Sequence, residues 1–273
     1  MKKTAQYLRD RKTAGEKLAV LTCYDYPSAT WQEAAGVDVI FVGDSVGTNV
    51  LGYGSEREVT MDDMLHHLKA VRRGVQEAYL LADLPYGTCD TPAGTLENAL
   101  RFASLGADGV KLEGFRPDLV EALAGRHIGA WGHLGYTPQH HPRAGLQART
   151  AAAGAELMEQ CAGLERAGAS AIVLELVPEE VAEAITARLA IPTIGIGAGR
   201  GCDGQVLVVS DLLGINRQEL RHLTRYEDFQ ARGRAALTRW VDDVRAGRFP
   251  GAEHTRHLSA AELEAFERWL TGS

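Results

Sequence analysis

Residues 78–113 read AYLLADLPYGTCDTPAGTLENALRFASLGADGVKLE, and this stretch contains one complete strand–helix–strand unit. It begins and ends with short apolar runs, whose length suits buried strands. Between them, Thr91 followed by Pro92 is a typical helix start, and Gly106 is a typical helix end. A helix between two buried strands is typical of parallel strands in an α/β fold.

The same unit recurs along the chain. Steps similar to Leu105-Gly106-Ala107-Asp108 lie at 35–38 and 167–170, each between a helical pattern and an apolar run. Most runs are continuous and not alternating, as expected for parallel strands covered by helices on both faces. Eight such units without a Pro/Ser-rich linker predict a closed (β/α)8 TIM barrel and favour it over a doubly wound open sheet. The eight predicted strands are residues 18–23, 38–43, 78–82, 108–112, 127–132, 170–176, 192–196 and 205–209.

The length of 273 residues is compatible with one barrel domain over 1–273, because such barrels run to about 250 residues. Two segments fall outside the eight units. We expect residues 1–15 to cap the bottom of the barrel. We expect residues 216–273 to form a C-terminal helical extension, with helices near 227–246 and 259–270, that packs on the barrel or on a neighbouring subunit.

The composition excludes several classes of protein. A net charge of −7 argues against a nucleic-acid partner, because phosphates are neutralised by basic surfaces. The sequence has neither an apolar run long enough to span a membrane nor a signal-peptide pattern, so we expect a cytoplasmic protein. Its four cysteines form no C-x-x-C pair, which argues against a disulfide framework or a zinc site. Small-molecule chemistry is the remaining expectation.

Reactive side chains gather at the predicted strand ends, where the active sites of barrel enzymes lie. Lys111 and Glu113 are two residues apart on one strand and therefore share a face. The candidates are Asp44, Ser45, Asp83, Lys111, Glu113, His133, Glu175, Glu179 and Glu180.

Three of these carboxylates, on Asp44, Asp83 and Glu113, end consecutive strands and would repel one another without a cation between them. Oxygen ligands with open positions suit Mg²⁺. The alternative is that strand-end Asp residues only cap the following helices.

Three other motifs are weaker. The glycine-rich stretch 195–201 matches no phosphate-loop spacing and suits a tight turn or a close backbone approach. The adjacent pairs His66-His67 and His140-His141 favour solvated or structural roles over a metal site. A cysteine nucleophile lacks a recognisable histidine partner.

The motifs resemble those of ketopantoate hydroxymethyltransferase in order and spacing, to about residue 215 and again at 249–254. The resemblance implies transfer of a hydroxymethyl unit from 5,10-methylenetetrahydrofolate to 3-methyl-2-oxobutanoate through a Mg²⁺-stabilised enolate. The product would be 2-dehydropantoate, a precursor of pantothenate and coenzyme A. The matching motifs are YDY at 24–26, VGDSVG at 42–47, VRRG at 71–74, LADLP at 81–85, VKLEG at 110–114, GHLGYTPQ at 132–139, LELVP at 174–178, IGIGAG at 194–199 and DGQ at 203–205.

The resemblance also implies roles for individual residues. Glu180 would be the catalytic base that removes the C3 proton, and Asp44, Asp83 and Glu113 would hold one Mg²⁺ per subunit. The family further suggests a homo-oligomer, a decamer, whose partners are a 2-oxo acid and a folate, with no nucleic acid and no membrane. The implied substrate-binding residues are Asp44, Ser45, Asp83, Lys111 and His133.

The sequence departs from the family pattern at 140–149, which is shorter than the usual glycine-rich stretch. Two other readings stay open. One is a 2-oxo-acid barrel of the phosphoenolpyruvate mutase and isocitrate lyase kind, although the reactive-cysteine loop of those enzymes is absent. The other is a metabolite-binding barrel that has lost catalysis.

Overall fold

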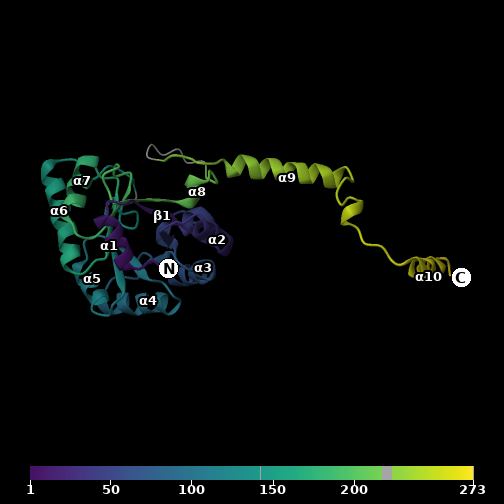
Figure 1. Cartoon of the computed structure of the whole chain (residues 1–273), viewed down its shortest axis with the longest axis horizontal. Coiled ribbons are helices and arrows are strands. Elements are labelled where there is room, and N and C mark those ends of the chain that lie inside the picture. The colour runs from purple at the N-terminus through teal and green to yellow at the C-terminus, as the bar shows by residue number, and fades with distance from the viewer. Residues whose placement is uncertain (142, 217–222, 273) are drawn as a thin grey trace. The chain divides into compact units, whose positions relative to one another are not determined.

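The computed structural model describes residues 1–141, 143–216 and 223–272. The chain divides into two compact units, Met1–Tyr226 and Glu227–Ser273. The first unit contains the strands and the helices around them, and the second contains α9 and α10 (Figure 1).

The strands of the first unit form a closed parallel barrel in chain order, with β8 paired to β1. The predicted TIM barrel is therefore confirmed. Side chains alternate along each strand, so that one set fills the barrel and the other packs under the helices. The strands are β1 (Leu18–Thr22), β2 (Val39–Val42), β3 (Tyr79–Asp83), β4 (Gly109–Glu113), β5 (Gly129–Gly135), β6 (Ala171–Glu175), β7 (Thr193–Ile196) and β8 (Gly204–Leu207).

Six helices follow the first six strands, and capping residues explain where they begin. Thr60 and Asp63 form a reciprocal capping box at α3, and Thr91 accepts the N–H of Gly94 at α4. The helices are α2 (Tyr26–Ala34), α3 (Met61–Gly74), α4 (Pro92–Ser104), α5 (Pro117–Ala124), α6 (Ala151–Arg166) and α7 (Glu179–Arg188). Two short helical turns, η1 (Gly47–Leu51) and η2 (Glu56–Glu58), lie between β2 and α3.

The ring of helices is incomplete beside β8. The described residues 197–203 join β7 to β8 without a helix, and α8 after β8 spans only Val209–Leu212. The side chains of Ala19 on β1 and Gln205 on β8 are consequently exposed, whereas every residue of β2, β3 and β4 is buried.

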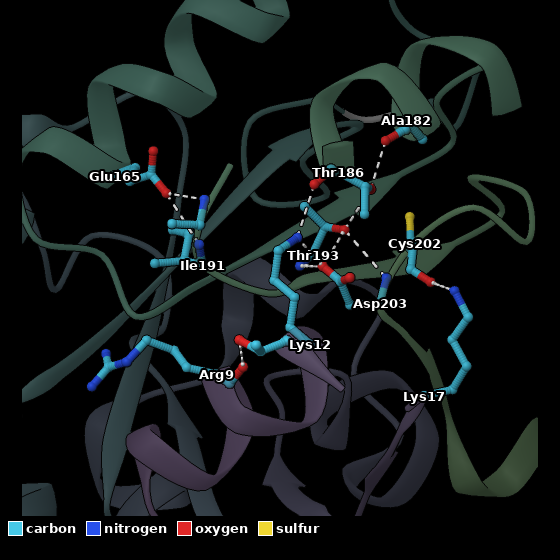
Figure 2. A network of polar contacts seen from close by, with 12 residues as sticks. Arg9, Lys12, Lys17, Glu165, Ala182, Thr186, Ile191, Thr193, Cys202 and Asp203 are labelled. Atoms are coloured by element: carbon cyan, nitrogen blue, oxygen red, sulfur yellow. Dashed lines mark hydrogen bonds and ion pairs between the residues drawn. The ribbon is translucent and has the colours of Figure 1, made fainter. Parts of the chain in front are cut away.

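Helix α1 (Ala5–Thr13) closes the barrel floor, as predicted for residues 1–15. Its Leu8 is fully buried in the interior core with residues of β1, β2 and β3. Lys12 Nζ lies 2.7 Å from Asp203 Oδ2, just before β8, and donates to the carbonyl of Thr186 on α7 (Figure 2). The same Asp203 oxygen accepts the N–H of Thr193 at the start of β7. Lys12 and Asp203 therefore tie α1 to the starts of β7 and β8, which are neighbouring strands.

The second unit contains α9 (Phe229–Arg245), η3 (Ala252–His254) and α10 (Ala260–Thr271). Helices α9 and α10 lie where the sequence predicted helices, near 227–246 and 259–270, and the second unit begins at Glu227. None of the described residues of this unit is buried. The expectation that this unit packs on the barrel or on a neighbouring subunit stays a prediction. Among the described residues, no helix combines the length and apolar character needed to cross a membrane.

Candidate active site

A cavity of about 590 Å³ opens at the C-terminal ends of the strands. Its inner part is apolar, with Phe41, Leu81, Trp131 and Val173 pointing into the barrel. Its polar residues come from the ends of the strands and the loops after them. They are Asp44, Ser45, Asp83, Lys111, Glu113, His133 and Glu175, together with Thr22, Thr48, Asn49, Glu56, Tyr136 and Asp211.

Alternation along the strands explains how this polar layer forms. Leu81 and Asp83 are two residues apart on β3, Trp131 and His133 on β5, and Val173 and Glu175 on β6. Each pair therefore shares the inward face, with the apolar member deeper and the polar member nearer the mouth. All six residues line the cavity.

Asp44, Asp83 and Lys111 form the first part of the polar layer. Lys111 Nζ lies 2.8 Å from Asp83 Oδ1, and the main-chain N–H of Asp44 donates to Asp83 Oδ2 over 3.3 Å. The side chains of Lys111 and Asp83 are only 4% and 1% exposed, so their ion pair is nearly free of solvent. Glu113, which was expected to share the face of Lys111, has its Oε1 4.0 Å from the same ammonium.

Glu113, His133 and Glu175 form the second part. His133 Nδ1 lies 3.3 Å from Glu113 Oε1, and its Nε2 lies 3.2 Å from Glu175 Oε2. The other oxygen of Glu113 accepts the main-chain N–H of Gln139 and lies 3.6 Å from His140 Nδ1. Both oxygens of Glu113 therefore already have protein partners, whereas Glu175 is reached from one side and is 19% exposed to the cavity.

Burial and neighbouring charges both shift the pKa values of the side chains in this polar layer. Burial, followed by the charge of Asp83, raises the pKa of Asp44 well above its usual value, and burial also raises the pKa of Asp83. Burial acts against the charged form of Lys111, but Asp83 and Glu113 outweigh it and raise the pKa of the ammonium.

The pKa values of Glu113 and His133 move apart. Burial would raise the pKa of Glu113, but hydrogen bonds from His133 and His140 hold that pKa well below its usual range. Burial and Lys111 would lower the pKa of His133, but its hydrogen bonds to Glu113 and Glu175 raise it to about 9. Lys111 Nζ also lies 3.3 Å from His133 Nδ1, and the two side chains together face four carboxylates in the same layer.

Ser45 sits at the cavity wall, where its position is fixed by two neighbours. Its Oγ lies 2.8 Å from the hydroxyl of Tyr24, and its carbonyl accepts the side-chain amide of Asn49 in η1. Asn49 in turn accepts the hydroxyl of Ser210 on α8. The turn after β2 is thereby held against the segment that follows β8.

The structure gathers all of the candidate residues around the cavity except Glu179 and Glu180. Asp44, Ser45, Asp83, Lys111, Glu113 and His133 line the cavity. Glu180 does not, because it is an exposed residue in the first turn of α7. Glu175 occupies the position by the cavity instead. Strand alternation could have indicated this, since Glu175 continues the inward face of β6 and Glu180 lies in the next helix.

Gln139 was not anticipated as a site residue. It is 1% exposed, and its side-chain Nε2 lies 2.7 Å from Asp44 Oδ2. The loop that follows it takes part in the same site, since Ala144, Gly145 and Leu146 line the cavity. Residues 144–146, within the segment where the sequence departs from the family pattern, are therefore part of the cavity wall.

The weaker motifs have structural partners. Gly199, with a φ of +77°, packs so closely on Glu179 that any side chain there would collide with it. His67 Nδ1 contacts the carbonyl of Tyr24 at 2.6 Å. Burial raises the pKa of the Cys23 thiol to about 12 and that of the Cys89 thiol to about 11, which disfavours the thiolate that a nucleophile requires.

Among the described residues, no three His, Cys, Asp or Glu side chains converge as in a preformed metal site. The donor set nevertheless suits a divalent cation. Four carboxylates face two cationic side chains, which leaves two negative charges unbalanced when all are ionised. The raised pKa of Asp44 reflects this excess and its burial.

The family model of ketopantoate hydroxymethyltransferase matches residues 2–252. A relative named 3-methyl-2-oxobutanoate hydroxymethyltransferase from Chloroflexus aurantiacus is 47% identical over 95% of this chain and 94% of its own length. Relatives of the same name from Nitratidesulfovibrio vulgaris and Dehalococcoides mccartyi are 46% and 44% identical and cover 94% and 98% of the chain, with 86% and 99% of their own lengths aligned.

Solved structures with a similar fold are far more distant in sequence. Phosphonopyruvate hydrolase in complex with oxalate and Mg²⁺ has a TM-score of 0.62 at 14% identity, over 99% of this chain and 98% of that one. For 2,3-dimethylmalate lyase the TM-score is 0.58 at 15% identity, with 100% of both chains covered. These likenesses concern the barrel alone, whereas the family model and the relatives at 44–47% identity establish the family. The chain belongs to the ketopantoate hydroxymethyltransferase family.

Proposed function

We propose that this hydroxymethyltransferase acts on 3-methyl-2-oxobutanoate by removing its C3 proton with Glu175. The observation that carries the proposal is the position of Glu175, which lines the cavity and has one carboxylate oxygen on His133. A general base must reach the proton that it removes. Glu180, the base expected from the sequence, is exposed on α7 and does not line the cavity.

We propose Asp44 and Asp83 as the protein ligands of a Mg²⁺ ion. Both lie close together in the cavity wall, and they are the carboxylates whose pKa values burial raises. Glu113, the third ligand expected from the sequence, lines the same cavity, and its oxygens face His133, His140 and Gln139. A bound Mg²⁺ would supply positive charge to the oxygens of the 2-oxo acid and so favour loss of the C3 proton.

The remaining residues have roles that follow from their places. The Lys111 ammonium provides a second positive charge for the substrate carboxylate. His133 orients Glu175, because its Nε2 lies 3.2 Å from one carboxylate oxygen. The branched alkyl end of the substrate fits the apolar interior around Phe41 and Trp131. A water-poor, apolar surrounding strengthens each of these electrostatic interactions.

We propose 5,10-methylenetetrahydrofolate as the donor of the one-carbon unit. The cavity volume of about 590 Å³ lies in the range of sites that hold drug-sized ligands, which leaves room for a second reactant beside the small 2-oxo acid. The deprotonated C3 attacks the methylene carbon, so that the new C–C bond forms as one of the two C–N bonds to the folate breaks. Water replaces the second folate nitrogen and supplies the hydroxyl group. The two nitrogens take up the C3 proton and one proton of water, which gives tetrahydrofolate.

Solvent exchange tests the base directly. The protein is incubated with Mg²⁺ and 3-methyl-2-oxobutanoate in D₂O, and the C3 proton is followed by NMR. We expect exchange with the wild type and with Glu180→Gln, a loss of about 100-fold or more with Glu175→Gln, and a loss on chelation of the metal. Normal exchange in Glu175→Gln with none in Glu180→Gln would identify Glu180, and not Glu175, as the base that removes the C3 proton.

We also propose a homo-oligomer in the cytoplasm. On α9, Phe229, Leu237, Trp240 and Val244 recur at spacings that place them on one face, and they are 38–65% exposed. An apolar stripe of this kind is typical of a surface that packs on another protein. Light scattering measures the molar mass of the full chain and of the double variant Leu237→Glu/Trp240→Glu. We expect a lower mass for the variant, and a variant with the same mass as the wild type would contradict packing through this face.

A further inference from the structure

Gln139 occupies a buried position that the proposed chemistry does not use. It lies in the loop after β5 and is 1% exposed. Its side-chain Nε2 is 2.7 Å from Asp44 Oδ2 and 3.1 Å from the carbonyl oxygen of Leu84. Both partners accept hydrogen bonds, so both hydrogens of the amide are used and the orientation of the amide is fixed.

The main chain of Gln139 makes a third contact of the same kind. Its N–H donates to Glu113 Oε2 over 3.0 Å. Asp44 follows β2, Leu84 follows β3 and Glu113 ends β4. A single residue of the β5 loop therefore ties together the ends of three other strands, at the point where the polar layer of the cavity is built.

We propose that Gln139 is a positioning residue, which holds Asp44 by Oδ2 so that Oδ1 meets the ligand in the cavity. The inference rests on the proposed function, since it assumes that Asp44 contacts the metal or the 2-oxo acid. A carboxylate held by one oxygen presents the other at a constant place, and hydrogen-bond partners behind ligating carboxylates contribute strongly to metal affinity.

The chemistry of an amide suits this task. A lysine at the same place would also hold Asp44, but its charge would compete with a bound cation. An amide donates two hydrogen bonds and adds no charge, so it fixes Asp44 without reducing the negative charge that attracts the cation. Nearly complete burial keeps water from replacing either bond.

The test compares the full-length wild type with Gln139→Met, which keeps the length of the side chain and the main-chain N–H but removes both side-chain donors. Mn²⁺ serves as the probe, and its binding is measured by electron paramagnetic resonance with 3-methyl-2-oxobutanoate present. We expect the Kd for Mn²⁺ to rise about 10- to 100-fold. Gln6→Met, an exposed change on α1, should leave the Kd unchanged.

The outcomes separate this inference from the proposed function. If the wild type binds Mn²⁺ and exchanges the C3 proton while folded Gln139→Met does both equally well, Gln139 has no positioning role and only this inference fails. If the wild type itself neither binds Mn²⁺ nor exchanges the proton, both fail. Should Gln139→Met not fold, Gln139→Asn, which keeps the amide but is too short to reach Asp44, is subject to the same comparison.

Discussion

The Nε2 atom of His133 lies 3.2 Å from Oε2 of Glu175, while the other nitrogen of the same ring lies 3.3 Å from Oε1 of Glu113. One buried imidazole thus joins the proposed base to a second carboxylate of the cavity wall. Because both neighbours are acidic, the pKa of His133 rises to about 9 despite burial and the charge of Lys111, which act against it. The Lys111 ammonium lies 3.3 Å from Nδ1 of the same ring, so the imidazole meets one cation as well as the two carboxylates.

Replacing His133 with Gln should lower kcat by about 10- to 100-fold with a smaller change in KM, because Glu175 loses the group that orients it. Steady-state kinetics measure both parameters. His66→Gln is the matched control, since His66 is exposed on α3 and should leave kcat unchanged. A His133 variant with the kcat of the wild type would show that Glu175 is held by other means.

Most of the fold could be predicted from the sequence because local signals agreed with the global arrangement. Apolar runs of five to seven residues bounded by Gly, Asp or Pro correspond to all eight strands. The incomplete ring beside β8 could not be predicted in this way. The stretch around Gly199 lacks the length for a helix, but whether an outer face stays uncovered depends on packing between segments distant in sequence.

The site was predictable to the extent that it follows strand alternation. Asp83, Lys111, Glu113 and His133 lie on or at the end of strands, and their direction follows from their place in the strand. Several acidic residues lie near β6, and which of them reaches the cavity depends on where β6 ends and α7 begins. Gln139 lies in a loop, where no periodicity indicates direction, so its contacts with Asp44 and Leu84 emerge only from the folded chain.

Asp38 should make stability depend on acid pH. Burial would raise its pKa, but hydrogen bonds from Lys3, the N–H of Ala19 and Tyr7 outweigh it and lower the pKa below the usual value. A lowered pKa stabilises the fold above the ordinary pKa of about 3.9, and this contribution is lost as pH falls through the lower folded value. Asp38→Asn should cost about 2 to 3 kcal/mol at pH 7.

Urea unfolding of wild type and Asp38→Asn between pH 7 and pH 2 checks this, with exposed Asp90→Asn as the control. The difference in unfolding free energy should be constant above about pH 5 and shrink towards zero below about pH 4. A difference that persists unchanged at the lowest pH would mean that Asp38 acts through packing and not through its charge.

The ion pair between Lys12 and Asp203 should couple the stability of α1 to that of the barrel floor, where β7 and β8 begin. Both side chains are 13% exposed, and the Asp203 oxygen that meets Lys12 also accepts the N–H of Thr193 (Figure 2). Lys12→Met and Asp203→Asn should each destabilise the protein, and the double variant should cost about 1 to 2 kcal/mol less than their sum. Chemical unfolding of the four proteins gives this coupling energy, and strict additivity would contradict it.

Tyr79 limits the size of the side chain at Gly109. A Cβ on Gly109 would lie 2.8 Å from the carbonyl oxygen of Gly129 and closer still to the Tyr79 hydroxyl, which donates to the carbonyl of Asp108. Gly109→Ala should therefore lower the free energy of unfolding by about 1 to 3 kcal/mol, because the barrel interior cannot accommodate an added methyl group. In a Tyr79→Phe background the same change should cost less, since the nearest atom is gone.

Thermal unfolding of Gly109→Ala, Tyr79→Phe and the double variant measures this dependence. Gly233→Ala is the control, because Gly233 lies within α9 and a Cβ there meets no other atom within 4 Å. That change should raise stability by up to about 1 kcal/mol through helix propensity alone. If Gly109→Ala were equally costly with and without the Tyr79 hydroxyl, the contact with the Gly129 backbone would account for the whole effect, and the hydroxyl would not be what limits this position.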